Sequence, residues 1–158
     1  MRFSRFGLPL HFTESTLVSG HPMAPEIVDL NDYQVDDWPT TPDGEGRQAE
    51  QVVTHYTTLL SHPAVAAVTW WGLADGGWLN APSGPLRADG SPKPAFDALR
   101  GLIKGAWWLV PTRLATDDRG RVRFTGFLGE YECTWPGGMA TLSLDHPGPP
   151  AVEVRLDV

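Results

Sequence analysis

Residues 65–71 read VAAVTWW, an almost continuously apolar run that is rich in β-branched and aromatic side chains. Helices cover both faces of a parallel sheet, so its inner strands carry apolar residues on both sides instead of alternating with polar ones. The run therefore predicts a strand that is buried on both faces. A Gly- and Pro-rich stretch follows at residues 72–92 and is expected to form a loop.

The segment before this strand predicts a helix that begins near Gly46 and ends before Pro63. Asp43 and Glu45 lie near the expected start, where negative charge suits the helix dipole. The apolar residues recur at steps of three and four, which places them on one helix face. These residues are Ala49, Val52, Val53, Tyr56, Leu59 and Leu60.

Two more elements flank this core. Residues 8–13 (LPLHFT) predict a short buried strand that is followed by Glu14, and residues 95–103 predict a second amphipathic helix. The polar stretch at residues 19–46 is expected to form a long loop, and loops of that length usually have a function. The order strand, helix, strand, helix indicates an α/β fold with parallel strands.

The pattern changes after Gly105. The rest of the chain predicts a small antiparallel β-module, with turns at residues 117–120 and 146–150. Its expected strands cover residues 107–115, 122–133, 140–144 and 151–156. We therefore expect two domains, residues 1–104 and residues 105–158.

Composition narrows the range of functions. The 158 residues carry a formal net charge of −7 and no Lys/Arg cluster, which argues against nucleic acid as a partner. No apolar run approaches the roughly 20 residues that span a membrane, and the first residues do not resemble a signal peptide. Cys133 is the one cysteine; it cannot form an internal disulfide and is expected to be buried and inert.

Two strands and two helices cannot cover both faces of a parallel sheet. Either the chain associates with copies of itself or it is the end of a larger barrel, and the second interpretation is the more economical. In such a barrel the catalytic residues lie at the carboxyl ends of strands. Glu14 closes the first strand, Trp71 closes the second, and Trp78 lies in the next loop. A carboxylate beside indole rings is the combination that a glycosidase site requires.

Three segments carry a resemblance to a known family: LPLHFTE (8–14), VTWWGLADGGWLN (68–80) and PLRADGSPKPAFDALRGLI (85–103). In this order they resemble the C-terminal part of glycoside hydrolase family 10, the endo-β-1,4-xylanases. The resemblance implies a partial TIM (β/α)8 barrel, with the seventh and eighth strands and their helices in residues 1–104. It implies that Glu14 is the nucleophile, that His11 supports it, and that Trp71 and Trp78 contact the sugar. It also implies no cofactor and an extracellular location.

The chain departs from the family pattern at two points. Thr16 stands where the family usually has an acidic residue, two positions after the nucleophile. The family's general acid/base comes from its fourth strand, which would lie upstream of Met1. A retaining mechanism needs two carboxyl groups about 5–5.5 Å apart. The resemblance thus implies double-displacement hydrolysis of β-1,4-xylosidic bonds in xylan, with the nucleophile in this chain and the acid/base strand missing from it.

Two alternatives stay open: a non-catalytic carbohydrate-binding protein and an inactive truncated fragment. The expected partner is xylan or another β-1,4-linked polysaccharide, with no nucleic acid, no membrane and no metal, and exposed barrel edges leave self-association open. The β-module either caps the barrel or binds sugar. A sugar-binding role would require an exposed ring at Tyr131 or Trp135.

Other residues have more ordinary expected roles. Trp70 is expected to pack against a helix, and Asp75 to accept a hydrogen bond in its loop. Trp107 and Trp108 are expected to pack at the domain junction. The acidic residues between positions 29 and 37 are expected to be solvated loop surface.

Overall fold

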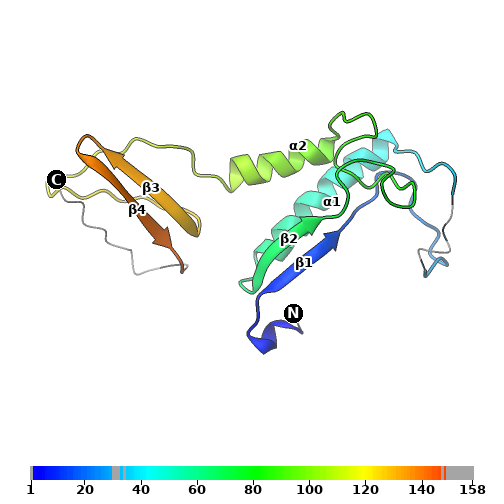
Figure 1. Cartoon of the computed structure of the whole chain (residues 1–158), viewed down its shortest axis with the longest axis horizontal. Helices are drawn as coiled ribbons and strands as arrows, with labels where there is room; N and C mark the ends of the chain where they lie inside the picture. The colour runs from blue at the N-terminus through cyan, green and yellow to red at the C-terminus, as the bar shows by residue number, and fades with distance from the viewer. Residues whose placement is uncertain (1, 30–32, 34, 147, 149–158) are drawn as a thin grey trace. The chain divides into compact units, whose positions relative to one another are not determined.

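The computed structural model describes residues 2–29, 33, 35–146 and 148. The chain divides into two compact units, Met1–Ile103 and Lys104–Val158, which are described separately below. Figure 1 shows the elements of both units.

The first unit contains two parallel strands, β1 (Leu10–Ser15) and β2 (Val65–Trp70), after a short 3-10 helix, η1 (Ser4–Phe6). Figure 1 shows the two arrowheads at the same edge of the sheet. The predicted parallel pairing is therefore confirmed. The described residues form a partial α/β fold with a two-stranded sheet, and they do not close into a barrel.

The prediction that residues 65–71 are buried on both faces is wrong for the described structure. Ala66 and Thr69 of β2 are exposed, while Val65 and Val68 are half-buried. The helix α1 lies against β2, and nothing else in the described part of the chain covers the exposed side chains. The apolar run therefore forms the expected strand, with less cover than its composition predicts.

The helix α1 spans Pro42–Leu60 and begins earlier than the predicted start near Gly46. Its first turn is stabilised by the Thr41 side chain, which accepts a hydrogen bond from the Gly44 backbone N–H at 3.1 Å. Proline at the first helical position adds to this start signal. Of the six apolar residues predicted to share one helix face, Val52, Tyr56 and Leu59 are buried and Ala49 is half-buried. Val53 and Leu60 are exposed, so the prediction is wrong for these two.

The second predicted helix is also present. The helix α2 spans Pro94–Gly101, and a single π-helical turn, η3 (Leu102–Ala106), continues it. Ala95 has no exposed surface, and α2 packs against α1. The core of the first unit therefore lies between these two helices and β2.

The second unit contains an antiparallel hairpin, β3 (Gly129–Trp135) and β4 (Gly138–Leu144), which pair from end to end. The predicted turn at residues 117–120 is confirmed, because the Gly120 N–H donates to the Asp117 carbonyl at 2.9 Å. The expected strand at residues 107–115 is wrong, and residues 122–128 are not strand either. Among the described residues, no other strand pairs with these segments. An apolar segment does not form a β-strand without a partner strand. The expected strand at residues 151–156 lies outside the described residues.

Within the described residues, no helix is both long and apolar enough to cross a bilayer.

Candidate functional site at the carboxyl ends of the strands

The carboxyl ends of β1 and β2 are joined by one backbone hydrogen bond. The N–H of Trp71 donates to the carbonyl oxygen of Ser15 at 2.8 Å. Glu14 precedes Ser15 and is exposed, and the Trp71 side chain is 45% exposed. A solvent-accessible carboxylate and a solvent-accessible indole therefore come from adjacent strand ends.

Glu14 lies in an irregular part of the ladder. Phe12 pairs with Val68 and Ser15 pairs with Trp70, so β1 advances three residues while β2 advances two. Such a bulge changes the direction in which side chains leave a strand. His11, three residues before Glu14, is also exposed. The alternation of a regular strand therefore does not decide whether these two side chains share a face.

Trp78 lies in a loop of its own, residues 73–86, which we call the tryptophan loop. The N–H of Leu86 donates to Leu73 O at 3.2 Å and closes the base of this loop. At its tip the Ala81 N–H donates to Trp78 O at 2.8 Å, and Leu79 and Asn80 have φ values of 49° and 53°. Positive φ at both central residues is the signature of a type I′ turn.

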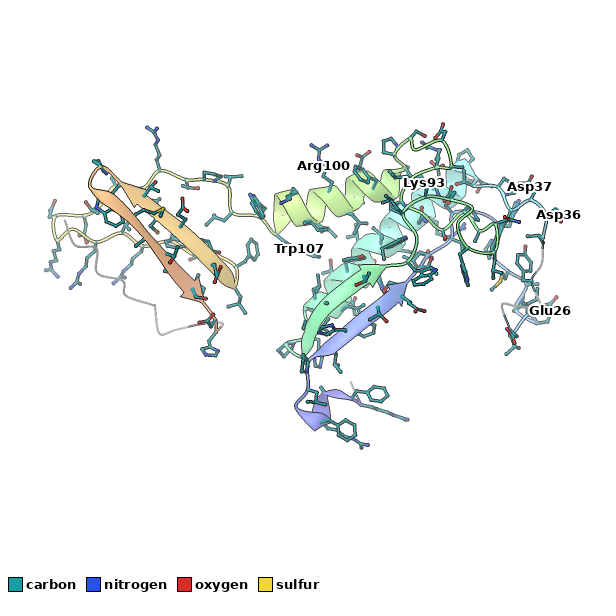
Figure 2. All side chains as sticks on the ribbon, in the orientation of Figure 1. Glu26, Asp36, Asp37, Lys93, Arg100 and Trp107 are labelled. Atoms are coloured by element: carbon teal, nitrogen blue, oxygen red, sulfur yellow. The ribbon has the colours of Figure 1, made fainter. Side chains whose placement is uncertain are left out.

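Lys93 lies at the start of α2, where Figure 2 labels it. Its side chain has no exposed surface. Its ammonium donates to Asp75 Oδ1 at 2.6 Å, to Ser19 Oγ at 2.8 Å and to Pro82 O at 3.4 Å. Burial lowers the pKa of Lys93, and the hydrogen bond that Lys93 donates to Asp75 opposes that effect. The three acceptors match the three protons that an ammonium can donate.

The predicted role of Asp75 as a hydrogen-bond acceptor is confirmed, because it also accepts from the Gly84 N–H at 3.0 Å. Its donor, Lys93, was not predicted from the sequence. One signal was present: Lys93 stands between two prolines, immediately before an apolar helix start. A lysine at such a position must either reach solvent or find an acceptor.

A second ion pair lies nearby. Arg87 Nε donates to Glu45 Oε1 at 2.8 Å, and Arg87 Nη2 contacts Glu45 Oε2, so the guanidinium binds both carboxylate oxygens. This hydrogen bonding raises the pKa of Arg87. Glu45 is buried, although the sequence predicts for it only a role in the helix dipole. Its pairing fixes the start of α1 to the chain that follows the tryptophan loop.

The loop after β1 is held by further polar contacts. Gln48 of α1 donates to Leu17 O at 2.7 Å, and the Thr41 N–H donates to Ser19 O at 2.9 Å. The backbone of Gly44 passes so close to Ser19 that a Cβ at Gly44 would lie 1.9 Å from Ser19 O. The start of α1 and the two loops that follow the strands therefore form one polar cluster.

Several other predicted roles are settled by the structure. Trp70 packs against a helix as predicted, because it stacks on Tyr56 of α1 at 6.4 Å between ring centroids. Its indole N–H also donates to Ser83 O at 3.0 Å. Asp36 and Asp37 of the acidic segment are exposed, as predicted, and both are labelled in Figure 2.

In the second unit, the burial of Cys133 differs from the prediction. Cys133 is half-buried, not buried, because a two-stranded sheet cannot enclose it. Tyr131 and Trp135 are also half-buried. The Tyr131 hydroxyl donates to Phe127 O at 2.7 Å. Trp107 is half-buried, and the ammonium of Lys104 lies 4.0 Å from the ring centroid of Trp108.

In the first unit, a groove of about 520 Å³ lies along α1. One of the side chains that line it is His55, whose Nε2 lies 3.0 Å from Ser15 Oγ. The groove includes none of Glu14, Trp71 and Trp78. In the part of the chain that the structure describes, no group of three or more His, Cys, Asp or Glu side chains is arranged to hold a metal ion.

No protein-family model and no curated protein matches this chain. The solved structures that have partial likeness to it include three xylanases. They are xylanase 10B from Thermotoga petrophila RKU-1 in complex with xylobiose (20% identity, TM-score 0.47), native xylanase 10B from Thermotoga maritima (20%, 0.47) and endo-1,4-beta-xylanase from Caldicellulosiruptor owensensis (18%, 0.48). The matches cover 66%, 66% and 61% of this chain, and 29%, 30% and 30% of the respective xylanase chains.

The three structures are xylanases, the class of protein that the sequence motifs resemble. The chain spans less than a third of the length of each of them. At these identities and TM-scores, the likeness does not carry an activity or a site over to this chain.

Proposed function

We propose that this chain supplies the nucleophile and two sugar-contacting tryptophans of a retaining β-1,4-xylanase. The observation that supports this most is the hydrogen bond from the Trp71 N–H to Ser15 O, which joins the strand end of Glu14 to that of Trp71. A glycosidase needs its carboxylate beside a surface on which a sugar ring can lie. Two adjacent parallel strand ends with those side chains meet this need.

In the proposed reaction the exposed carboxylate of Glu14 attacks the anomeric carbon and forms a glycosyl-enzyme ester. The bond from that carbon to the leaving oxygen breaks, and a second carboxyl group donates a proton to the oxygen. The same group then takes a proton from water, which displaces Glu14. The family resemblance assigns this second group to a strand other than β1 and β2. His11 is proposed to support Glu14 from the same strand.

Trp71 and Trp78 are proposed to bind the faces of neighbouring xylose units. Trp71 is 45% exposed, and Trp78 is half-buried on the tryptophan loop. Stacking on an indole suits a pyranose, which presents C–H groups on its faces. A polymeric substrate of this kind also fits the proposed extracellular location.

The decisive experiment labels the nucleophile directly. A 2-fluoroxyloside with a dinitrophenyl leaving group should react with the carboxylate even without an acid, because the phenolate leaves unprotonated. The full chain should gain the mass of one fluoroxylosyl group on the peptide that contains Glu14. The Glu14→Gln variant should gain nothing, and Glu130→Gln, which changes an exposed carboxylate in β3, should label normally. Labelling at another carboxylate would refute the assignment of Glu14.

A second candidate function is sugar binding without cleavage. The observation that favours it is the exposure of Trp71, since a platform for stacking requires no second carboxyl group. Titration calorimetry of Glu14→Gln with xylohexaose should then show affinity equal to that of the unchanged chain. Absence of heat with both proteins would reject this function and leave the inactive fragment as the remaining alternative.

A further inference from the structure

We infer that Lys93 is a positioning residue, whose ammonium holds the tryptophan loop, and with it Trp78, in place beside the loop that follows β1. The inference deepens the proposed function, because it rests on Trp78 being a sugar contact. Its geometric basis is independent of that role. It consists of three hydrogen bonds from one fully buried ammonium to two different loops.

The ammonium binds both limbs of the tryptophan loop. Asp75 lies on the outgoing limb and Pro82 on the returning limb, and Lys93 donates to an oxygen of each. The Gly84 N–H also donates to Asp75 Oδ1, the oxygen that Lys93 binds. Because Trp78 lies between these limbs, the contacts of Lys93 restrict the separation of the limbs and hence the position of the indole.

The third contact joins the tryptophan loop to the chain after β1. Ser19 Oγ accepts from Lys93 at 2.8 Å and also contacts Pro82 O at 2.9 Å. The Ser19 N–H donates to the same carbonyl at 3.0 Å. Lys93, Ser19 and Pro82 thus form a closed set of hydrogen bonds. Ser19 lies five positions after Glu14 in the sequence, so the contact links the tryptophan loop to the chain that follows the proposed nucleophile.

The tip of the tryptophan loop needs such support. Leu79 and Asn80, directly after Trp78, both have left-handed backbone conformations. These conformations are unfavourable for residues that have a Cβ. A strained turn persists when its surroundings hold it in place. Among the described residues, Asp75 is the residue of this loop that forms an ion pair, and its partner is Lys93.

The charged ammonium of Lys93, and not the volume of its side chain, is what holds the tryptophan loop in place. Methionine has a similar length and would fill the same space, but it cannot donate to any of the three acceptors. The variant Lys93→Met therefore removes the contacts with little change in packing. Arg87→Met is the matched control, because it removes another cation of this region and leaves Asp75, Ser19 and Pro82 unchanged.

The first test is an NMR spectrum of the indole N–H groups of the full ¹⁵N-labelled chain, with Trp71 and Trp78 assigned from Trp→Phe variants. In Lys93→Met the Trp78 signal should shift or broaden beyond detection, and in Arg87→Met it should stay in place. If Lys93→Met fails to fold by circular dichroism, Asp75→Asn replaces it and should move the same signal. Equal displacement of the Trp78 signal by Arg87→Met, or none by the Lys93 and Asp75 variants, would overturn the inference.

The second test measures xylohexaose affinity by calorimetry at a temperature where each variant is folded. Lys93→Met should weaken binding about tenfold, and Arg87→Met should leave it unchanged. If the unchanged chain binds no xylohexaose, the proposed function fails, and the indole spectra still decide the role of Lys93. If the chain binds and Lys93→Met binds equally well, the inference fails and the proposed function stands.

Discussion

The ammonium of Lys93 lies 2.6 Å from a carboxylate oxygen of Asp75, at a place where the Lys93 side chain has no exposed surface. A charge removed from water loses its hydration energy, and only well-placed partners can offset that loss. Here the partners belong to the loop that follows β1, the strand of Glu14, and to the loop that carries Trp78. The same contacts that stabilise the charge therefore order these loops.

Breaking this ion pair should be costly. Lys93→Met leaves the carboxylate of Asp75, which is 11% exposed, without a cation, and we expect the free energy of unfolding to fall by about 3 kcal/mol or more. Arg87→Met should cost about 1–2 kcal/mol, because Arg87 is 37% exposed and water can replace part of its pair with Glu45. Urea denaturation of both variants checks this order. A larger loss in Arg87→Met would contradict it.

Two of the buried titratable groups, Lys93 and Tyr56, predict opposite slopes of stability against pH. Burial lowers the pKa of Lys93 below its ordinary 10.5. Between the folded pKa and 10.5 the unfolded chain binds more protons, so the free energy of unfolding should rise with pH. Burial raises the pKa of Tyr56 above its ordinary 10.0, so the folded chain keeps its proton longer and stability should fall as pH rises beyond 10.0.

Variants separate the two effects. Urea denaturation at a series of pH values from about 8 to 12 should show no rise in Lys93→Met and a reduced fall in Tyr56→Phe. A rise of the same size in Lys93→Met would show that another group produces it.

Two glycines of α1 should respond oppositely to alanine. At Gly44 a Cβ would lie 1.9 Å from Ser19 O, so Gly44→Ala must displace the loop after β1 and should destabilise the chain by more than about 2 kcal/mol. At Gly46 a Cβ would meet nothing within 4 Å, and Gly46→Ala should stabilise the helix by about 0.5–1 kcal/mol. Thermal unfolding followed by circular dichroism measures both. Equal effects would mean that the close approach at Gly44 is not maintained in solution.

Sequence periodicity predicts the local elements of this chain well. The spacing from Ala49 to Leu60 predicts the helix α1, and the apolar run at residues 65–71 predicts the strand β2, Val65–Trp70. Strand pairing is a different matter, because it needs a partner elsewhere in the chain. Residues 107–115 have the composition of a strand and remain unpaired in the described structure.

The ion pairs of the polar cluster could not be predicted from sequence patterns for the same reason. Lys93 pairs with Asp75 across 18 positions, and Arg87 pairs with Glu45 across 42. No local periodicity connects such positions, and only the folded chain brings them together. The bulge around Glu14 is also invisible in the sequence, since it depends on the register between two strands 55 positions apart at Leu10 and Val65.

The turn after Trp78 offers a test of backbone strain. Asn80 has a φ of 53°, and its side-chain nitrogen contacts Val35 O at 3.4 Å. Asn80→Gly and Asn80→Ala both lose that contact, so the difference between them reports the backbone conformation. Glycine adopts positive φ freely and alanine does not, so the glycine variant should be more stable by about 0.5–1 kcal/mol in urea denaturation. Greater stability of the alanine variant would show that the type I′ turn does not persist.

Trp70 and Trp71 are neighbours with opposite expected roles. Trp70 stacks on Tyr56 and donates to Ser83 O, so Trp70→Ala should lower the free energy of unfolding by about 3 kcal/mol. Trp71 is 45% exposed, so Trp71→Ala should change stability by less than about 1 kcal/mol. If Trp71 is a sugar platform, its loss should instead weaken xylohexaose binding at least tenfold, measured by calorimetry on folded protein. Unchanged affinity in Trp71→Ala would remove this residue from the proposed site while leaving the packing role of Trp70 intact.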